Sequence, residues 1–190
     1  MITIRIVYFL TALTVFVIML ATVAGYYYLN NRKRRKYPYG KWETLLKRLG
    51  AVNKDNVALI ARDLIDESGR RRTDEDDLDL EPSQIWDLIG GMQGLHVLEL
   101  NCAVLVDLVF YVQQWYPEAL VIAEQLRQNT REIEWHIGRL KGAEKNGRLD
   151  AAFGDYAQRA VAIYFVMTRR VLSVYEQLDL PGLAELQQAL

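Results

Sequence analysis

Two histidines and two glutamates are the residues of this sequence whose types and spacing could bind a metal ion. His96 and Glu99 are three residues apart in one helix-forming stretch, and Glu132 and His136 are four apart in the next. Residues three or four apart share a face of a helix, so each stretch would offer one imidazole and one carboxylate. Bundles that hold two iron ions use the same residue types, and two histidines on facing helices could ligate haem. A metal- or haem-dependent redox bundle is therefore one hypothesis.

The spacing of these residues argues against such a site. Di-iron bundles use Glu-x-x-His on two helices, whereas this chain has His-x-x-Glu at residues 96–99 and Glu-x-x-x-His at residues 132–136. We therefore expect no metal and no cofactor. The polar residues of the first stretch should instead form an exposed edge or pair with arginines of the second. The residues concerned are His96, Glu99, Asp107 and Gln114 on the first stretch, and Arg127, Arg131 and Arg139 on the second.

No arrangement typical of an enzyme is found in the sequence. It contains no G-x-S-x-G motif, no P-loop and no G-x-G-x-x-G motif. The one cysteine, Cys102, lies on an apolar helical face, where a thiol behaves as a small hydrophobic group. The only basic cluster adjoins the apolar N-terminal segment, so we do not expect nucleic-acid binding. These observations favour a non-catalytic protein.

The N-terminal residues have the composition of a membrane-spanning helix. No charged residue lies between Arg5 and Arg32, and a helix over residues 6–29 would be about 36 Å long, enough to cross a bilayer. Aromatic and basic residues that suit the headgroup level follow. The predicted membrane-interface residues are Tyr26, Tyr27, Tyr28, Arg32, Lys33, Arg34, Arg35, Lys36 and Trp42. The alternative is a signal peptide cleaved near Ala24, but the apolar run continues past that residue and ends at five basic residues.

Charge is distributed unevenly along the 190 residues. Residues 1–50 carry nine basic side chains and one acidic side chain, whereas residues 51–190 carry 14 basic and 23 acidic ones. Because basic residues that flank a span stay on the cytoplasmic side, we expect a single-pass protein of the cell membrane with most of the chain in the cytoplasm. Anionic lipid at the basic segment is the expected membrane partner.

The remainder of the chain has the apolar periodicity of an all-α protein. Steps of three and four residues predict three long helices, and short connections between them favour an antiparallel bundle on which shorter helices pack. No alternation typical of β-strands is present. The long helices are predicted over residues 83–115, 117–141 and 149–178, and the shorter ones over 40–50, 56–67 and after residue 182. Gly90, Gly91 and Gly94 mark a kink in the first long helix or a close backbone approach.

These features divide the chain into three predicted parts. Residues 1–31 form a transmembrane anchor, residues 32–54 a polybasic and aromatic neck, and residues 55–190 a cytoplasmic helical bundle. Within the bundle, residues 69–81 are too highly charged to bury an apolar face, which predicts a mobile loop. The helix over residues 40–50 would lie on the membrane surface or pack against the bundle.

The long apolar faces, together with the missing catalytic residues, lead to a hypothesis of function. Residues 160–167 are uncharged, so this helix is either enclosed on all sides or forms an interface, for which Tyr164, Phe165 and Met167 are the candidates. We therefore expect a membrane-anchored interaction or scaffolding module that self-associates or binds a protein partner. The alternatives are the redox bundle that uses His96, Glu99, Glu132 and His136, and a sensor that binds a small molecule or lipid in a bundle cavity.

Overall fold

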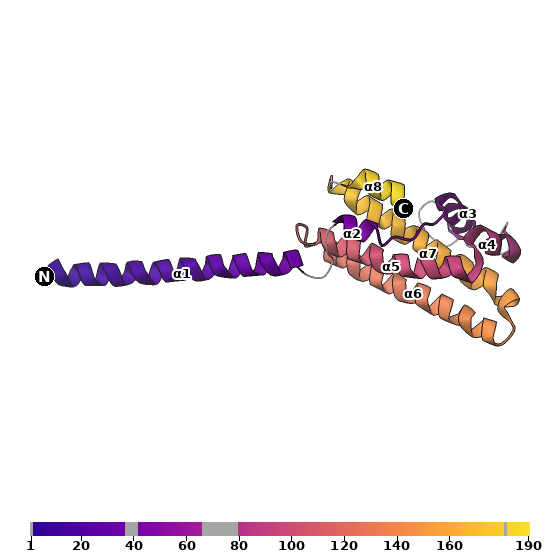
Figure 1. The fold of residues 1–190 in the computed structure, drawn as a ribbon, viewed down its shortest axis with the longest axis horizontal. Coiled ribbons are helices and arrows are strands. Elements are labelled where there is room, and N and C mark those ends of the chain that lie inside the picture. Colours follow the sequence, from indigo (N-terminus) through magenta and orange to yellow (C-terminus); the bar gives the residue numbers. More distant parts are fainter. Residues whose placement is uncertain (1, 37–41, 66–79, 181) are drawn as a thin grey trace. The chain divides into compact units, whose positions relative to one another are not determined.

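The structure, a computed structural model, describes residues 2–36, 42–65, 80–180 and 182–190, with side chains described from residue 9 to residue 27 in the first of these ranges. Most described residues are helical and none belongs to a β-strand element, so the all-α prediction is confirmed (Figure 1). The chain divides into two compact units, Met1–Gly40 and Lys41–Leu190. The charged loop predicted over residues 69–81 lies outside the described residues, except for its last two positions.

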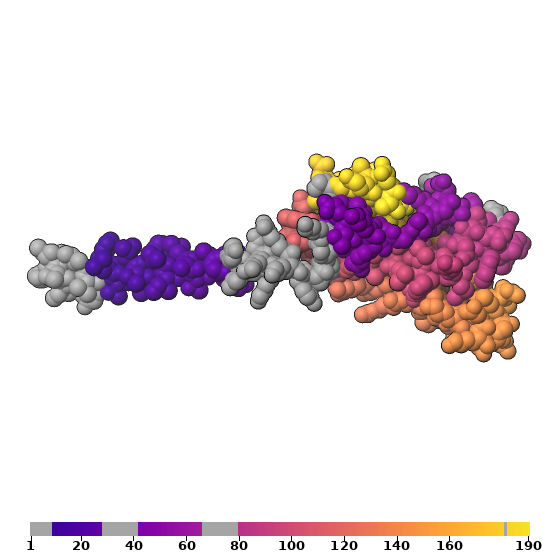
Figure 2. Space-filling model, viewed as in Figure 1, coloured from indigo at the N-terminus to yellow at the C-terminus, as the bar shows by residue number. Residues whose placement is uncertain are grey.

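The first unit is a single helix, α1 (Ile2–Lys36). It is longer at both ends than the predicted residues 6–29, because arginine and lysine are good helix formers and the helix continues through the basic segment. No residue of Phe9–Tyr27 is buried in the structure (Figure 2). An apolar helix of this length without a protein cover is typical of a membrane span.

A second helix is also long and apolar enough to cross a membrane. Among the described residues the two such helices are Phe9–Tyr27, within α1, and α5 (Gly91–Val112). Most of α5 is buried by other helices of the second unit, which is what a central core helix requires. Length and composition therefore do not distinguish the two helices, whereas the fraction of each helix that is buried does.

The second unit is built around three long helices: α5, α6 (Ala119–Lys145) and α7 (Leu149–Gln177). Each of the three packs against the other two (Figure 1). The shorter helices cover them: α3 (Lys54–Leu64) packs on α7, α4 (Pro82–Ile89) on α7 and α5, α2 (Trp42–Leu46) on α5, and α8 (Leu183–Ala189) on α7.

The predicted apolar faces of the three long helices form the core. These side chains are at most 5% exposed and recur at steps of three, four or seven residues, as helix packing requires. They include Leu95, Leu98, Cys102, Leu105, Val109 and Val112 on α5, Ala123, Leu126, Ile133, Ile137 and Leu140 on α6, and Phe153, Ala160, Met167, Val171 and Val174 on α7.

The glycine cluster ends one helix and begins another. Gly90 has φ +79°, a left-handed conformation that ends α4, and its N–H donates to the carbonyl of Trp86 (3.0 Å). Gly94 lies so close to the carbonyl of Ile89 that a Cβ would come within 1.7 Å of that oxygen. The predicted single helix over residues 83–115 is therefore two helices, because the cluster both turns the chain and allows close backbone contact.

The segment before α3 packs on α5 within the second unit. Leu45 of α2 is buried, and the Asn101 side chain on α5 both accepts from the Gly50 N–H (2.7 Å) and donates to the Gly50 carbonyl (2.9 Å). Of the two interpretations of residues 40–50, packing against the domain is the one observed. Asn53 then caps α3 by accepting from the N–H groups of Asp55 and Asn56.

Candidate functional site

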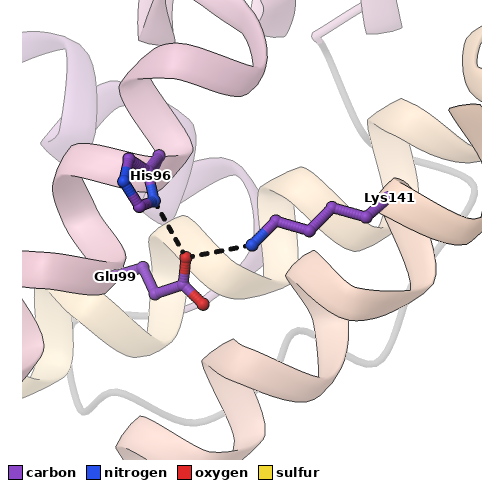
Figure 3. A network of polar contacts seen from close by, with 3 residues as sticks. All are labelled: His96, Glu99 and Lys141. Atoms are coloured by element: carbon purple, nitrogen blue, oxygen red, sulfur yellow. Dashed lines mark hydrogen bonds and ion pairs between the residues drawn. The ribbon is translucent and has the colours of Figure 1, made fainter.

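The predicted pair His96 and Glu99 lies on an exposed edge of α5. His96 Nδ1 lies 3.1 Å from Glu99 Oε2, and Lys141 Nζ of α6 donates to the same oxygen at 3.3 Å (Figure 3). The His96 side chain is 57% exposed. This is a surface ion-pair network, of a kind that contributes little to stability.

The second predicted pair lies in different surroundings. His136 of α6 is only 4% exposed, and its ring is flanked by those of Trp135 (5.0 Å between centroids) and Tyr156 (5.8 Å). Glu132 is exposed. The described residues contain no group of three or more His, Cys, Asp or Glu side chains that could hold a metal ion. The described residues therefore do not bring these four side chains together as a metal-binding cluster.

The polar edge of α5 pairs with other partners than predicted. Asp107 accepts a hydrogen bond from Arg48 (2.8 Å), and Glu99 accepts from Lys141. Two of the arginines expected opposite have other partners: Arg127 pairs with Glu124 and stacks on the ring of Phe110 of α5, and Arg139 stacks on the rings of Trp135 and Tyr156. Of the two arrangements expected for these polar residues, the exposed edge is the one observed at His96, and the packing of α2 on α5 places Arg48 beside Asp107.

Beside His136, residues of three helices line a groove with a volume of about 490 Å³. Its floor is apolar and its rim carries polar groups of both charges. The lining residues are Leu64 and Ile65 at the end of α3, Asn129, Glu132, Trp135 and His136 on α6, and Arg159, Ala162, Ile163 and Val166 on α7. We take this groove, named here the α3–α6–α7 groove, as the candidate functional site.

The end of α3 shapes the groove. Ile65 leaves the helix with an extended backbone, while its N–H still donates to the carbonyl of Ala61 (2.9 Å). Leu64 and Ile65 pack with Ala162 of α7 in a buried cluster, and Val166 packs at its edge, partly buried. Apolar side chains are thus held firmly at the bottom of an open groove.

His136 is the unusual polar group of the groove. Burial lowers the pKa of its imidazole below the ordinary value of 6.5, and the charge of Arg159 lowers it further, while Glu132 and Asp155 oppose this shift. The ring is therefore neutral at neutral pH. Its buried Nδ1 has no hydrogen-bond partner among the described residues, an arrangement that is uncommon for a buried polar atom.

One wall of the groove carries an exposed aromatic residue. Trp135 is 56% exposed, stacks edge-on with Tyr156 (5.8 Å) and lies beneath the guanidinium of Arg139 (5.8 Å). Across the groove, Arg159 donates from Nε to Asp155 (2.7 Å). Exposed tryptophan and arginine are the residue types most enriched where proteins bind partners.

The sequence predicted only two of the groove residues, Glu132 and His136. Trp135 was overlooked, although its place outside the apolar face of α6 was a usable signal, since a tryptophan there must lie at the surface. Leu64, Ile65 and Arg159 gave no such signal, because only the packing of α3 on α7 brings them to α6.

The predicted interface on α7 lies mostly in the interior. Tyr164 and Met167 are 3% and 0% exposed, and Phe165 is half-buried. Burial raises the pKa of Tyr164 to about 12, while its hydroxyl accepts a hydrogen bond from Asn101 (3.3 Å). Residues 160–167 are therefore largely enclosed, and Tyr164 and Met167 cannot present a surface in this fold.

The predicted membrane-interface residues fall into two groups. Tyr26 and Tyr27 are 66% and 67% exposed on α1, whereas the side chains of Tyr28 and residues 32–36 lie outside the described ones. Trp42 belongs to the second unit, where it stacks on Tyr175 (5.1 Å between centroids) and Tyr111 (6.1 Å). Trp42 is therefore a packing residue of that unit, because α2 folds back onto α5.

Comparison with known protein families, curated proteins and solved structures gives no match to this chain. The site is therefore interpreted from its own geometry. Three properties are combined in the α3–α6–α7 groove: an apolar floor, an exposed tryptophan, and a neutral buried imidazole beside an arginine and a glutamate. Such a surface can bind an apolar group and orient it through a few polar contacts.

Proposed function

We propose that the protein is a single-pass membrane protein whose cytoplasmic helical bundle binds a protein partner through the α3–α6–α7 groove. The anchoring part is supported by the uncovered apolar helix Phe9–Tyr27 and by the five basic residues that end α1. Burial of α5 within the second unit accounts for its apolar composition without a second span.

The orientation can be tested by cysteine labelling of intact cells. Burial, with smaller effects from Glu134 and Glu99, raises the pKa of the native Cys102 thiol to about 12, so this residue reacts too slowly to give a background signal. In this proposal Ser83→Cys, at an exposed position of α4, reacts with a membrane-impermeant maleimide only after permeabilisation, whereas Thr3→Cys reacts before it. The reverse pattern would place the bundle outside the cell.

The binding function rests on one observation: the groove has an apolar floor that the described residues leave open. Ile163 and Val166 are only partly buried there, and Trp135 extends the apolar surface toward solvent. We infer that an amphipathic helix of a partner protein lays its apolar side chains on this floor. Its polar residues would meet Arg159 and Glu132 at the rim, as in other helix-in-groove complexes.

Site-specific photocrosslinking tests this assignment in membranes of the source cell. A benzophenone amino acid replaces Trp135 in the groove, and in a matched control it replaces Leu100, which is equally exposed (56%) but lies on α5. We expect one discrete adduct from position 135 alone, and its loss when Ile163→Glu is added. Equal adducts from both positions, or an adduct that persists with Ile163→Glu, would contradict the groove assignment.

A small apolar ligand is the second candidate for the same groove. The volume of about 490 Å³ lies in the range of small-molecule pockets, and a neutral imidazole could donate to or accept from a polar ligand atom. Native mass spectrometry of the full chain released from nanodiscs separates the two candidates. Added mass of a few hundred daltons, lost in Ile163→Glu, would favour the ligand; a mass equal to that of the bare chain would favour the protein partner.

A further inference from the structure

The connection between α5 and α6 carries a cluster of exposed apolar side chains. We name residues 113–121 the α5–α6 corner. Trp115, Leu120 and Val121 are 58%, 42% and 63% exposed there. Outside α1, seven large apolar residues in the described part of the chain are exposed, and three of them fall within these nine residues. Apolar exposure concentrated at one corner indicates a contact surface.

The corner is joined to the start of the second unit by a chain of stacked rings. Trp115 contacts Tyr111 at 5.1 Å between centroids, and Tyr111 contacts Trp42 at 6.1 Å. Trp42 is held from behind by the ring of Tyr175 and by the backbone of Gly182, where a Cβ would come within 2.7 Å of the indole. The corner and Trp42 therefore form one rigid end of the unit.

The length of the chain limits how far this end can lie from the anchor. Five residues, 37–41, separate Lys36 at the end of α1 from Trp42. Even a fully extended chain of that length reaches only about 20 Å. If α1 spans the bilayer with its basic end among the headgroups, Trp42 and the rings attached to it stay close to the lipid surface.

We propose that the α5–α6 corner inserts into the headgroup region of the membrane in which α1 is anchored, and that its binding partner is the lipid bilayer. This inference rests on the proposed function. Tryptophan is the side chain that most favours this region, and Leu120 and Val121 add apolar area beside it. The second unit would then be held at the membrane at two places, the tether and the corner.

The charged residues near the α5–α6 corner indicate whether electrostatic attraction or apolar contact would drive its insertion. Glu118 is exposed within it, and the nearby Glu124 is paired with Arg127 at 2.7 Å. Neither the acidic Glu118 nor the paired Glu124 attracts anionic lipid, so insertion would be driven by apolar contact. Lipid charge should therefore affect the basic end of α1 but leave the depth of the corner nearly unchanged.

Spin labelling of the full chain in nanodiscs tests the proposal. A nitroxide is attached at Val121→Cys in the corner and, as a control, at Ser83→Cys on α4, beyond the opposite end of α5, a helix about 33 Å long. We expect the ratio of collisions with oxygen to collisions with a water-soluble nickel chelate to be several-fold higher at position 121. Replacing Trp115 and Leu120 by serine should bring that ratio down to the control value, and circular dichroism checks that the second unit stays folded in this variant.

Each contrary outcome has its own meaning. A chain that does not co-elute with nanodiscs contradicts the membrane anchor, and with it the proposed function. A chain that co-elutes but gives the same ratio at positions 121 and 83 contradicts the corner insertion alone. An immobilised label at position 121, shielded from both oxygen and nickel, would show a protein contact there and would equally overturn the lipid assignment.

Discussion

Helices α1 and α5 are both long and apolar enough to cross a membrane, yet they differ in how much of each helix is buried. None of Phe9–Tyr27 is buried, whereas most of Gly91–Val112 is covered by other helices. In α5 the few polar residues have partners: Asn101 binds Gly50, Asp107 binds Arg48 and Glu99 binds Lys141. Two helices of similar composition therefore differ here in what their neighbours supply: α5 is covered by other helices, and Phe9–Tyr27 of α1 is not.

A charge placed in each helix should give the largest difference between them. Leu105 is fully buried in α5, so Leu105→Asp should destabilise the second unit by more than about 4 kcal/mol and prevent its folding. The matched change Leu13→Asp, in the exposed stretch of α1, should leave the thermal unfolding of that unit unchanged and reduce only membrane insertion. Circular dichroism and nanodisc co-elution measure the two effects. Similar loss of folded helix in both variants would contradict the assignment.

Removing the buried amide of α5 should have the next largest effect. Asn101→Ala leaves the Gly50 N–H without its partner at 2.7 Å and should lower the free energy of unfolding by about 1–3 kcal/mol. Tyr164→Phe is the control, because it removes only the longer contact of 3.3 Å and should cost less. Chemical denaturation measures both values. An equal or larger loss in Tyr164→Phe would show that the Gly50 contact is not the main one.

Acid should affect the second unit and leave α1 unaffected. The pKa of His136 is lowered in the folded state, mainly by burial, so the unfolded chain binds more protons once the pH falls below about 6.5. This part of the stability is present above pH 6.5 and declines as the pH decreases toward the folded value. The midpoint of thermal unfolding should therefore fall between pH 7 and pH 5. The slope should diminish in His136→Gln, while nanodisc association stays constant.

The surface pair on α5 should have the smallest effect. Arg48 and Asp107 are 47% and 26% exposed, so Arg48→Ala should lower the free energy of unfolding by only about 0.2–1 kcal/mol, and by less at high salt. Lys141→Ala, which removes the Glu99 pair, serves as the comparison. A loss above about 2 kcal/mol in urea denaturation would mean that Arg48 holds α2 in place through more than its charge.

Much of the fold could be predicted because helix periodicity is a local property. Side chains three and four residues apart share a face whatever the rest of the chain does, so the apolar faces of α6 and α7 were found with nearly correct limits. The break at Gly90 was harder to predict, since a glycine cluster is compatible with either a kink or a close contact. Helix α6 also continues past the predicted end at residue 141 to Lys145, because the alanine, glutamate and lysine after Gly142 are good helix formers.

The candidate site could be predicted only in part, because its residues come from three helices. Glu132 and His136 were identified as possible metal ligands from their residue types. The sequence analysis grouped them with His96 and Glu99, which lie in a different environment. Arg159 reaches the same groove from α7. Such a juxtaposition depends on crossing angles and on the point where α3 ends, and no short sequence window contains that information.

The sequence by itself determined the properties that depend on neighbours along the chain: the uncharged N-terminal helix, the basic residues that follow it, and the apolar faces of the long helices. The tertiary structure alone decided that α5 lies in a core, that Trp42 packs on Tyr175, and that Tyr164 and Met167 are enclosed. The physical reason is that burial is a relation between helices. An apolar side chain is more stable out of water, and only packing decides whether protein or lipid surrounds it.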